Sequence, residues 1–161
     1  MKESTRQALD VLSKGINAEL AAYIFYKRAS EKVNKKEIAE LMEKLAFEEK
    51  DHYWTLEAEY DSLIRSEKWV TYNDLLRKKG LPEVPEEMAE FHRRRLDTLD
   101  NTNDEKTILK IALELEEEAR DLYHSQVNKT DDPAAREMYS FLAKVEQGHV
   151  VIINKWLEKL K

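Results

Sequence analysis

Apolar side chains recur every three or four residues along residues 5–65, which is the spacing that places them on one face of an α-helix. In the first stretch these positions are Leu9, Leu12, Ile16, Ala22, Tyr23, Tyr26 and Val33. In the second they are Ile38, Leu41, Met42, Leu45, Tyr53, Leu56, Tyr60 and Leu63. The pattern predicts one amphipathic helix over residues 5–33 and a second over residues 35–65.

Helix start signals accompany both stretches. Residues 4–7 (Ser-Thr-Arg-Gln) resemble a capping box for the first helix. Asn34, with Glu37 three residues later, predicts the N-cap of the second. Because so few residues separate the two helices, the second must run antiparallel to the first.

The same signals return in the last third of the chain. Residues 102–105 (Thr-Asn-Asp-Glu) form another capping-box pattern and open a third helix, expected over residues 104–128. Asp132 followed by Pro133 opens a fourth, expected over residues 133–160.

Residues 66–103 form a crossover in which the helical period is interrupted. Three residues break it: Gly80, Pro82 and Pro85. Short helices are expected within the crossover over residues 72–77 and 85–99. The crossover is too long for an unstructured loop in a compact domain, so we expect it to pack on the bundle or on another subunit, and we expect a homodimer.

Two short helical hairpins joined by a long crossover predict an all-α four-helix bundle, in a single domain over residues 1–161. The composition agrees with this architecture. Charged residues make up 37% of the chain and there are only three Gly and three Pro, which favours long helices over sheet.

Charge and hydropathy narrow the range of partners. A net charge of −6 provides no basic stripe for a phosphate backbone, so we expect no nucleic-acid partner. No run approaches the roughly 20 apolar residues of a membrane span, and residues 1–10 lack a signal-peptide core, so we expect a cytoplasmic protein. The absence of cysteine excludes thiolate zinc sites and iron–sulfur clusters, so any metal must be bound by oxygen and nitrogen.

A Glu-x-x-His motif occurs twice, at Glu49–His52 and at Glu146–His149. A glutamate lies 30 residues before each motif, Glu19 before the first and Glu116 before the second. The two halves of the chain therefore repeat at an offset of 97 residues. The same offset pairs Ala22 with Ala119, Tyr26 with Tyr123, and Leu45 with Leu142.

Residues three apart share a helix face, so the Glu and His of each motif can reach one point. The glutamates and histidines of the repeat lie on apolar faces and are expected to point into the bundle. Four carboxylates buried there without cations would each cost several kcal/mol or become protonated, whereas two divalent cations would balance them.

The repeat therefore supplies six candidate ligands for two metal ions. They fall into three pairs: Glu49 and Glu146 as bridges between the metals, Glu19 and Glu116 as terminal ligands, and His52 and His149 as nitrogen donors. An oxygen-rich donor set with one imidazole per metal suits iron or manganese better than copper, with zinc as a further possibility.

Four stretches, NAELAAYIFY, LAFEEKDH, LELEEEARDLY and LAKVEQGH, resemble the single-domain rubrerythrin-like branch of the ferritin-like superfamily. The resemblance covers the whole predicted bundle. It implies a ferritin-like four-helix bundle with a carboxylate-bridged di-iron centre. In that centre the six candidate ligands hold two iron ions that react with hydrogen peroxide or dioxygen.

The chain departs from rubrerythrins proper in two ways. Those proteins carry a cysteine-ligated rubredoxin domain, and this chain has no cysteine, so electrons must come from an external electron-donor protein or a small reductant. They also carry a further Glu three residues after the third-helix ligand, where this chain has Ala119. What remains is a symmetric six-ligand site that is more similar to that of bacterioferritin.

Other polar residues lie close to the candidate ligands in the predicted helices. Tyr26 and Tyr123 share the ligand face, where a phenol could hydrogen-bond a ligand or donate an electron, although core packing is the simpler role. Arg120 could pair with a ligand carboxylate or extend to solvent. Glu48 could orient an imidazole or be solvated. His124 is expected at the surface.

Three functions are consistent with these residues. The leading one is a redox enzyme that reduces hydrogen peroxide, as the rubrerythrin resemblance implies. The alternative is a ferroxidase that stores or delivers iron through the same ligands. A further alternative is a structural bundle that is stabilised by bound metal and catalyses no reaction.

Overall fold

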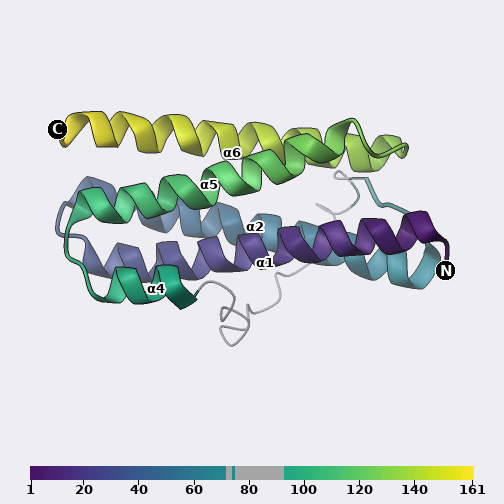
Figure 1. The fold of residues 1–161 in the computed structure, drawn as a ribbon, viewed down its shortest axis with the longest axis horizontal. Coiled ribbons are helices and arrows are strands. Elements are labelled where there is room, and N and C mark those ends of the chain that lie inside the picture. Colours follow the sequence, from purple (N-terminus) through teal and green to yellow (C-terminus); the bar gives the residue numbers. More distant parts are fainter. Residues whose placement is uncertain (72–73, 75–92) are drawn as a thin grey trace.

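The computed structural model describes residues 1–71, 74 and 93–161 of the chain (Figure 1). Within these residues it contains five helices and no strand, which confirms the all-α class. The helices are α1 (Glu3–Lys32), α2 (Lys36–Ser66), α4 (Arg93–Asp100), α5 (Glu105–Val127) and α6 (Pro133–Lys159).

Two antiparallel hairpins form the bundle. One hairpin consists of α1 and α2 and the other of α5 and α6, and α1 also packs against α5 and α4. Helix α2 ends beside the N-terminus, whereas α5 begins at the opposite end of the bundle (Figure 1). The connection between the hairpins therefore joins opposite ends of the bundle, as expected for a long crossover.

The core lies between the hairpins and is built from the predicted apolar faces. The largest side chains that are fully buried include Tyr26, Tyr123, Phe25, Leu12, Leu20, Ile38, Met42, Leu45 and Leu56. Burial of each such side chain stabilises the fold by roughly 1.5–3 kcal/mol. The helical period thus located the buried face of each long helix correctly.

Three of the four predicted helix starts need correction or adjustment. Helix α1 begins at Glu3, its N-cap is Lys2 without a side-chain cap, and the capping box expected at residues 4–7 is wrong. Ser4 and Thr5 lie inside the first turn of α1 rather than before it, so the helix is not capped by the Thr5 hydroxyl. It donates a hydrogen bond of 3.1 Å to Glu67 Oε2 at the end of α2.

The N-cap expected at Asn34 is also wrong, because Lys35 precedes α2 and provides no side-chain cap. At α5 the cap is shifted by two residues. Asp104, not Thr102, accepts a hydrogen bond from the Thr107 amide, at 3.2 Å. At α6 the expectation is confirmed, since Asp132 accepts from the amides of residues 134 and 135 and Pro133 occupies the first turn.

The crossover is described in part. The helix expected over residues 72–77 lies outside the described residues except for Asp74, and so do residues 85–92 of the second expected helix. Helix α4 covers the rest of that second helix and buries Leu96 and Leu99. The Lys32 ammonium donates to the Leu99 carbonyl oxygen, which joins α4 to the end of α1.

None of the helices in the described part of the chain combines the length and the apolar character that a membrane-spanning helix needs.

Candidate metal centre

The structure brings all six candidate ligands together inside the bundle. Helix α1 contributes Glu19, α2 contributes Glu49 and His52, α5 contributes Glu116, and α6 contributes Glu146 and His149. Each of the six has at most 4% of its surface exposed.

The six residues form two overlapping groups. Glu19, Glu49, His52 and Glu146 each place one donor atom within 4.8 Å of the others. The second group has the same geometry and consists of Glu49, Glu116, Glu146 and His149. Glu49 and Glu146 belong to both groups, which is the position that a ligand bridging two metal ions must occupy.

Helical geometry explains why each motif points to one place. In α2 the i, i+3 spacing places His52 Nδ1 3.7 Å from Glu49 Oε2. In α6 the same spacing places His149 Nδ1 3.3 Å from Glu146 Oε2. The two imidazole rings are 6.4 Å apart between centroids and only 19° from parallel. Both histidines therefore present Nδ1 to the carboxylates.

The bridging glutamates have strongly perturbed electrostatics. Burial raises the pKa of Glu49, and the charges of Glu116, Glu146 and Glu19 raise it further. The pKa of Glu146 is also raised, first by burial and then by the charges of Glu19 and Glu116. Both carboxyl groups therefore hold a proton more strongly than a free glutamate does when no cation is bound.

The terminal glutamates behave in the opposite way. Burial works to raise the pKa of Glu19, but hydrogen bonding to Glu49 and the charge of His52 outweigh it and lower the pKa to about 2. Burial likewise opposes ionisation of Glu116, yet hydrogen bonds with Glu146 and His149 lower its pKa. Each hairpin thus pairs a glutamate whose pKa is raised with one whose pKa is lowered.

The histidines are held in the charged form by these carboxylates. Burial alone would lower the pKa of His52, but the charge of Glu19 and hydrogen bonds with Glu146 and Glu19 raise it well above its usual value. The pKa of His149 is raised in the same way, chiefly by hydrogen bonds with Glu116, Glu146 and Glu49. In the metal-free centre the raised pKa values of two glutamates and two imidazoles thus favour bound protons, which offset the charge of the carboxylates.

This donor set fits two divalent cations. Three buried carboxylate oxygens of the centre lack a well-aligned hydrogen bond: Glu19 Oε2, Glu49 Oε1 and Glu146 Oε2. The last two lie 3.0 Å and 3.3 Å from His149 Nδ1, but one N–H cannot satisfy both. Buried acceptors without a donor are costly, and a cation removes that cost. Two divalent ions carry four positive charges, which balance the four ionised carboxylates, so the buried centre would be neutral with both histidines uncharged.

Two tyrosines support the terminal glutamates from the opposite hairpin. Tyr26 of α1 donates a hydrogen bond of 2.6 Å to Glu116 Oε1. Tyr123 of α5 donates one of 2.5 Å to Glu19 Oε1. Both rings are fully buried, so they combine core packing with a ligand contact. The repeat indicated that the two tyrosines are equivalent, but it did not indicate that each crosses to the other half.

Of the remaining polar candidates, one contacts a histidine of the centre and two do not. Glu48 Oε2 lies 2.7 Å from His149 Nε2, so this side chain does orient an imidazole. Arg120 instead forms hydrogen bonds with Asp121 and Gln147, and His124 is exposed.

Sequence reasoning missed one buried carboxylate, Glu59 of α2. Its side chain is fully buried and accepts a hydrogen bond of 2.9 Å from the Val70 amide. A signal was available, since Glu59 follows His52 by seven residues, which is two helical turns on the same face.

The fold and the centre agree with a comparison against known protein families. The model of the ferritin-like domain matches residues 7–159. The chain belongs to the ferritin-like domain family. Comparisons with curated proteins and with solved structures give no match. The membership confirms the ferritin-like part of the sequence interpretation and is compatible with a two-metal carboxylate centre.

Proposed function

We propose that this protein is a di-iron carboxylate redox enzyme of the rubrerythrin-like type, which reduces hydrogen peroxide with electrons from an external donor. The observation that carries the proposal is the overlap of the two buried donor groups at Glu49 and Glu146. Such an overlap is the arrangement of two carboxylate-bridged metal ions in ferritin-like proteins. Iron or manganese suits these oxygen and imidazole donors best, and zinc is a further candidate.

Each part of the centre has a separate task in this proposal. Two bound iron ions would supply the two electrons that cleave the O–O bond of the peroxide. Glu49 and Glu146 hold the two cation positions close together. Tyr26 and Tyr123 fix the terminal carboxylates, and the apolar core around the centre keeps bulk water out.

Iron oxidation for storage or delivery is the second candidate. Ala119, buried at 6% exposure, stands where rubrerythrins proper have a further glutamate. A six-ligand site of this kind is similar to the ferroxidase centre of bacterioferritin, so the same geometry supports a ferroxidase that uses dioxygen.

Stopped-flow oxidation of the diferrous protein separates the two functions. We expect hydrogen peroxide to oxidise the centre at least about tenfold faster than dioxygen at equal concentration, a difference of about 1.4 kcal/mol in barrier. We also expect repeated turnover to require an added reductant. A faster reaction with dioxygen, followed by accumulation of many ferric ions per chain, would support iron storage instead.

A further inference from the structure

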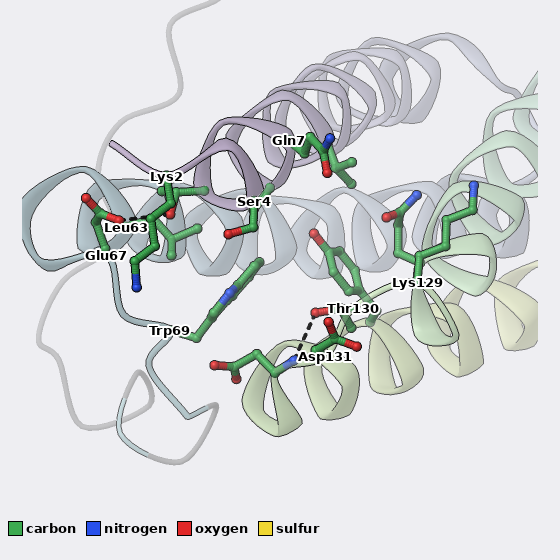
Figure 2. Close-up of a pocket in the computed structure, with 15 residues that line it drawn as sticks. Lys2, Ser4, Gln7, Leu63, Glu67, Trp69, Lys129, Thr130 and Asp131 are labelled. Atoms are coloured by element: carbon green, nitrogen blue, oxygen red, sulfur yellow. Dashed lines mark hydrogen bonds between the residues drawn. The ribbon is translucent and has the colours of Figure 1, made fainter.

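A pocket of about 570 Å³ opens at the end of the bundle where α1 begins and α2 ends (Figure 2). This volume is in the range of small-molecule sites. Trp69 projects into it from the segment after α2, between the first turn of α1 and the start of α6 (Figure 2). Tyr139 of α6 lines the same pocket, and polar side chains such as Lys2, Gln7 and Lys129 surround the opening.

Aromatic rings connect this pocket with the metal centre. Trp69 contacts Tyr139 edge to face, at 5.9 Å between ring centroids. Tyr139 stacks on Tyr123 at 6.3 Å with an interplanar angle of 24°. Tyr123 in turn donates its hydrogen bond to Glu19. Both ring separations are those of directly packed aromatic pairs, so no gap interrupts the series.

Within the part of the chain that the structure describes, this Trp-Tyr-Tyr series occurs in only one half of the internal repeat. Tyr26 and Tyr123 are equivalent in the repeat and make equivalent bonds to the terminal glutamates. At the same offset of 97 residues, however, the counterpart of Tyr139 is Met42. In the first half of the repeat, the position equivalent to the redox-active Tyr139 therefore holds no aromatic ring.

Several contacts hold Trp69 in place. The Val70 amide, directly after Trp69, donates to buried Glu59. Glu67, two residues before Trp69, ends α2 in a left-handed conformation with φ of 55° and accepts the hydrogen bond from Thr5. A non-glycine residue in that conformation needs support from its surroundings, and the bond from Thr5 provides it. The chain thus turns back so that the indole lies over Tyr139.

We propose that Trp69, Tyr139 and Tyr123 form a one-electron path into the metal centre, and that a small dihydroxyaromatic reductant delivers electrons to Trp69 in this pocket. The inference rests on the redox function proposed above. One hydroquinone molecule loses two electrons, one at a time, and two protons, and becomes a quinone. The peroxide gains the two electrons and two protons, its O–O bond breaks, and two water molecules form.

The first test maps oxidised side chains by mass spectrometry after the diferrous protein reacts with excess hydrogen peroxide and no reductant, because the iron ions supply only the first two electrons and side chains must supply the next ones. We expect oxygen addition at Trp69, with Trp54 and Trp156 as internal references. Tyr139→Phe should lower the yield at Trp69 at least tenfold relative to the amount of centre oxidised, and added hydroquinone should do the same in the parent protein. Tyr60→Phe, at a half-buried tyrosine of α2 outside this aromatic series, should leave that ratio unchanged.

Equal oxidation of all three tryptophans, or a Trp69 yield that Tyr139→Phe does not change, would overturn the path. Oxidation of Trp69 that persists in excess hydroquinone would overturn the assignment of the reductant. The absorbance of the iron centre is recorded in the same samples. A centre that does not oxidise at all would therefore identify a failure of the proposed function rather than of the path.

The second test needs no metal. In a Trp54→Phe/Trp156→Phe background Trp69 is the sole tryptophan, and azide radicals produced by pulse radiolysis oxidise it selectively. We expect the indolyl radical of the metal-free protein to convert into a tyrosyl radical, and Tyr139→Phe to slow that conversion at least tenfold. An unchanged rate would overturn the path whatever the metal centre does.

Discussion

At the scale of single residues, the centre depends on contacts that join the two halves of the chain. Glu19 and Glu116 belong to different hairpins, and each accepts a hydrogen bond from a tyrosine of the other hairpin. A hydrogen bond to a charged group stabilises by about 1.5–3 kcal/mol, so these two bonds help to fix the carboxylates before any metal binds. The centre is therefore preorganised rather than assembled by the metal alone.

Loss of one bridging glutamate should remove both metals. Glu49→Ala or Glu146→Ala should lower the metal content from two ions per chain to none, because each glutamate belongs to both donor groups. Glu49→Gln keeps the side-chain volume and should have the same effect. Elemental analysis provides the measurement, with exposed Glu40→Ala on the same helix as the control. Full occupancy in the bridging variants would remove the central claim about this site.

The contact between Glu48 and His149 makes the two metal positions unequal. At the repeat offset the counterpart of Glu48 is Val145, which offers no acceptor to an imidazole. Glu48→Gln should weaken one of the two metals about 10- to 100-fold and leave the other nearly unchanged, as is typical when a partner of a ligating histidine is lost. Competition titration with a chromophoric chelator measures both affinities. Exposed Glu43→Gln is the control, and equal weakening of both sites would contradict the assignment.

At the scale of the helix, two glycines show how local preference and packing compete. A methyl group at Gly15 of α1 would lie 3.1 Å from Leu56 Cδ1 and 3.3 Å from Tyr123 Cε1. The phenol of Tyr123 cannot shift freely, because it is bonded to Glu19. At Gly148 of α6 a methyl group would meet nothing within 4 Å. The same substitution should therefore have opposite effects in the two helices.

Gly148→Ala should raise the free energy of unfolding by about 0.5–1 kcal/mol, because alanine has the higher helix propensity. Gly15→Ala should lower it by about 1–3 kcal/mol, because overpacking against Tyr123 exceeds the gain in propensity. Urea denaturation of the metal-free variants measures both. Stabilisation by Gly15→Ala would show that Tyr123 has room to move.

At the scale of the whole molecule, the centre lies where the two hairpins meet, and its charge state couples stability to pH. In the metal-free protein the pKa values of Glu49, Glu146 and both histidines are raised above those of the unfolded chain. The folded state then binds more protons than the unfolded state above about pH 5, and its stability falls as pH rises. The pKa of Glu19 is instead lowered to about 2, so Glu19 contributes its full stabilisation above the usual pKa of a glutamate. That contribution is lost as the pH falls toward about 2.

Metal-free and metal-loaded protein should therefore respond to pH in opposite directions. The melting temperature of the metal-free protein should fall between about pH 5 and pH 8, most steeply above the usual pKa of histidine. Metal binding must displace protons from these groups, so the increase in melting temperature on adding manganese should grow over the same range. Calorimetry at several pH values checks this. Parallel pH profiles would show that the carboxylates do not share their protons as described.

Local signals in the sequence predicted some features and failed on others for a common reason. The repeated Glu-x-x-His motifs identified the six candidate ligands, because i, i+3 geometry holds in any helix. The caps expected at residues 4–7 and at Asn34 were wrong. An N-cap contributes only about 0.5–2 kcal/mol, less than the burial of one or two core side chains, so packing decides where these helices begin.

The sequence by itself determined the all-α class, the buried face of each long helix and the residues able to bind metal, because helical period and spacing are local properties. Only the tertiary structure decided which groups meet across the bundle. The bonds from Tyr26 to Glu116 and from Tyr123 to Glu19 join residues 90 and 104 positions apart. The contact of Trp69 with Tyr139 likewise joins the two hairpins. Such contacts depend on the rotation and axial shift of one hairpin against the other, which are set by the packing of both cores and not by the period of either helix.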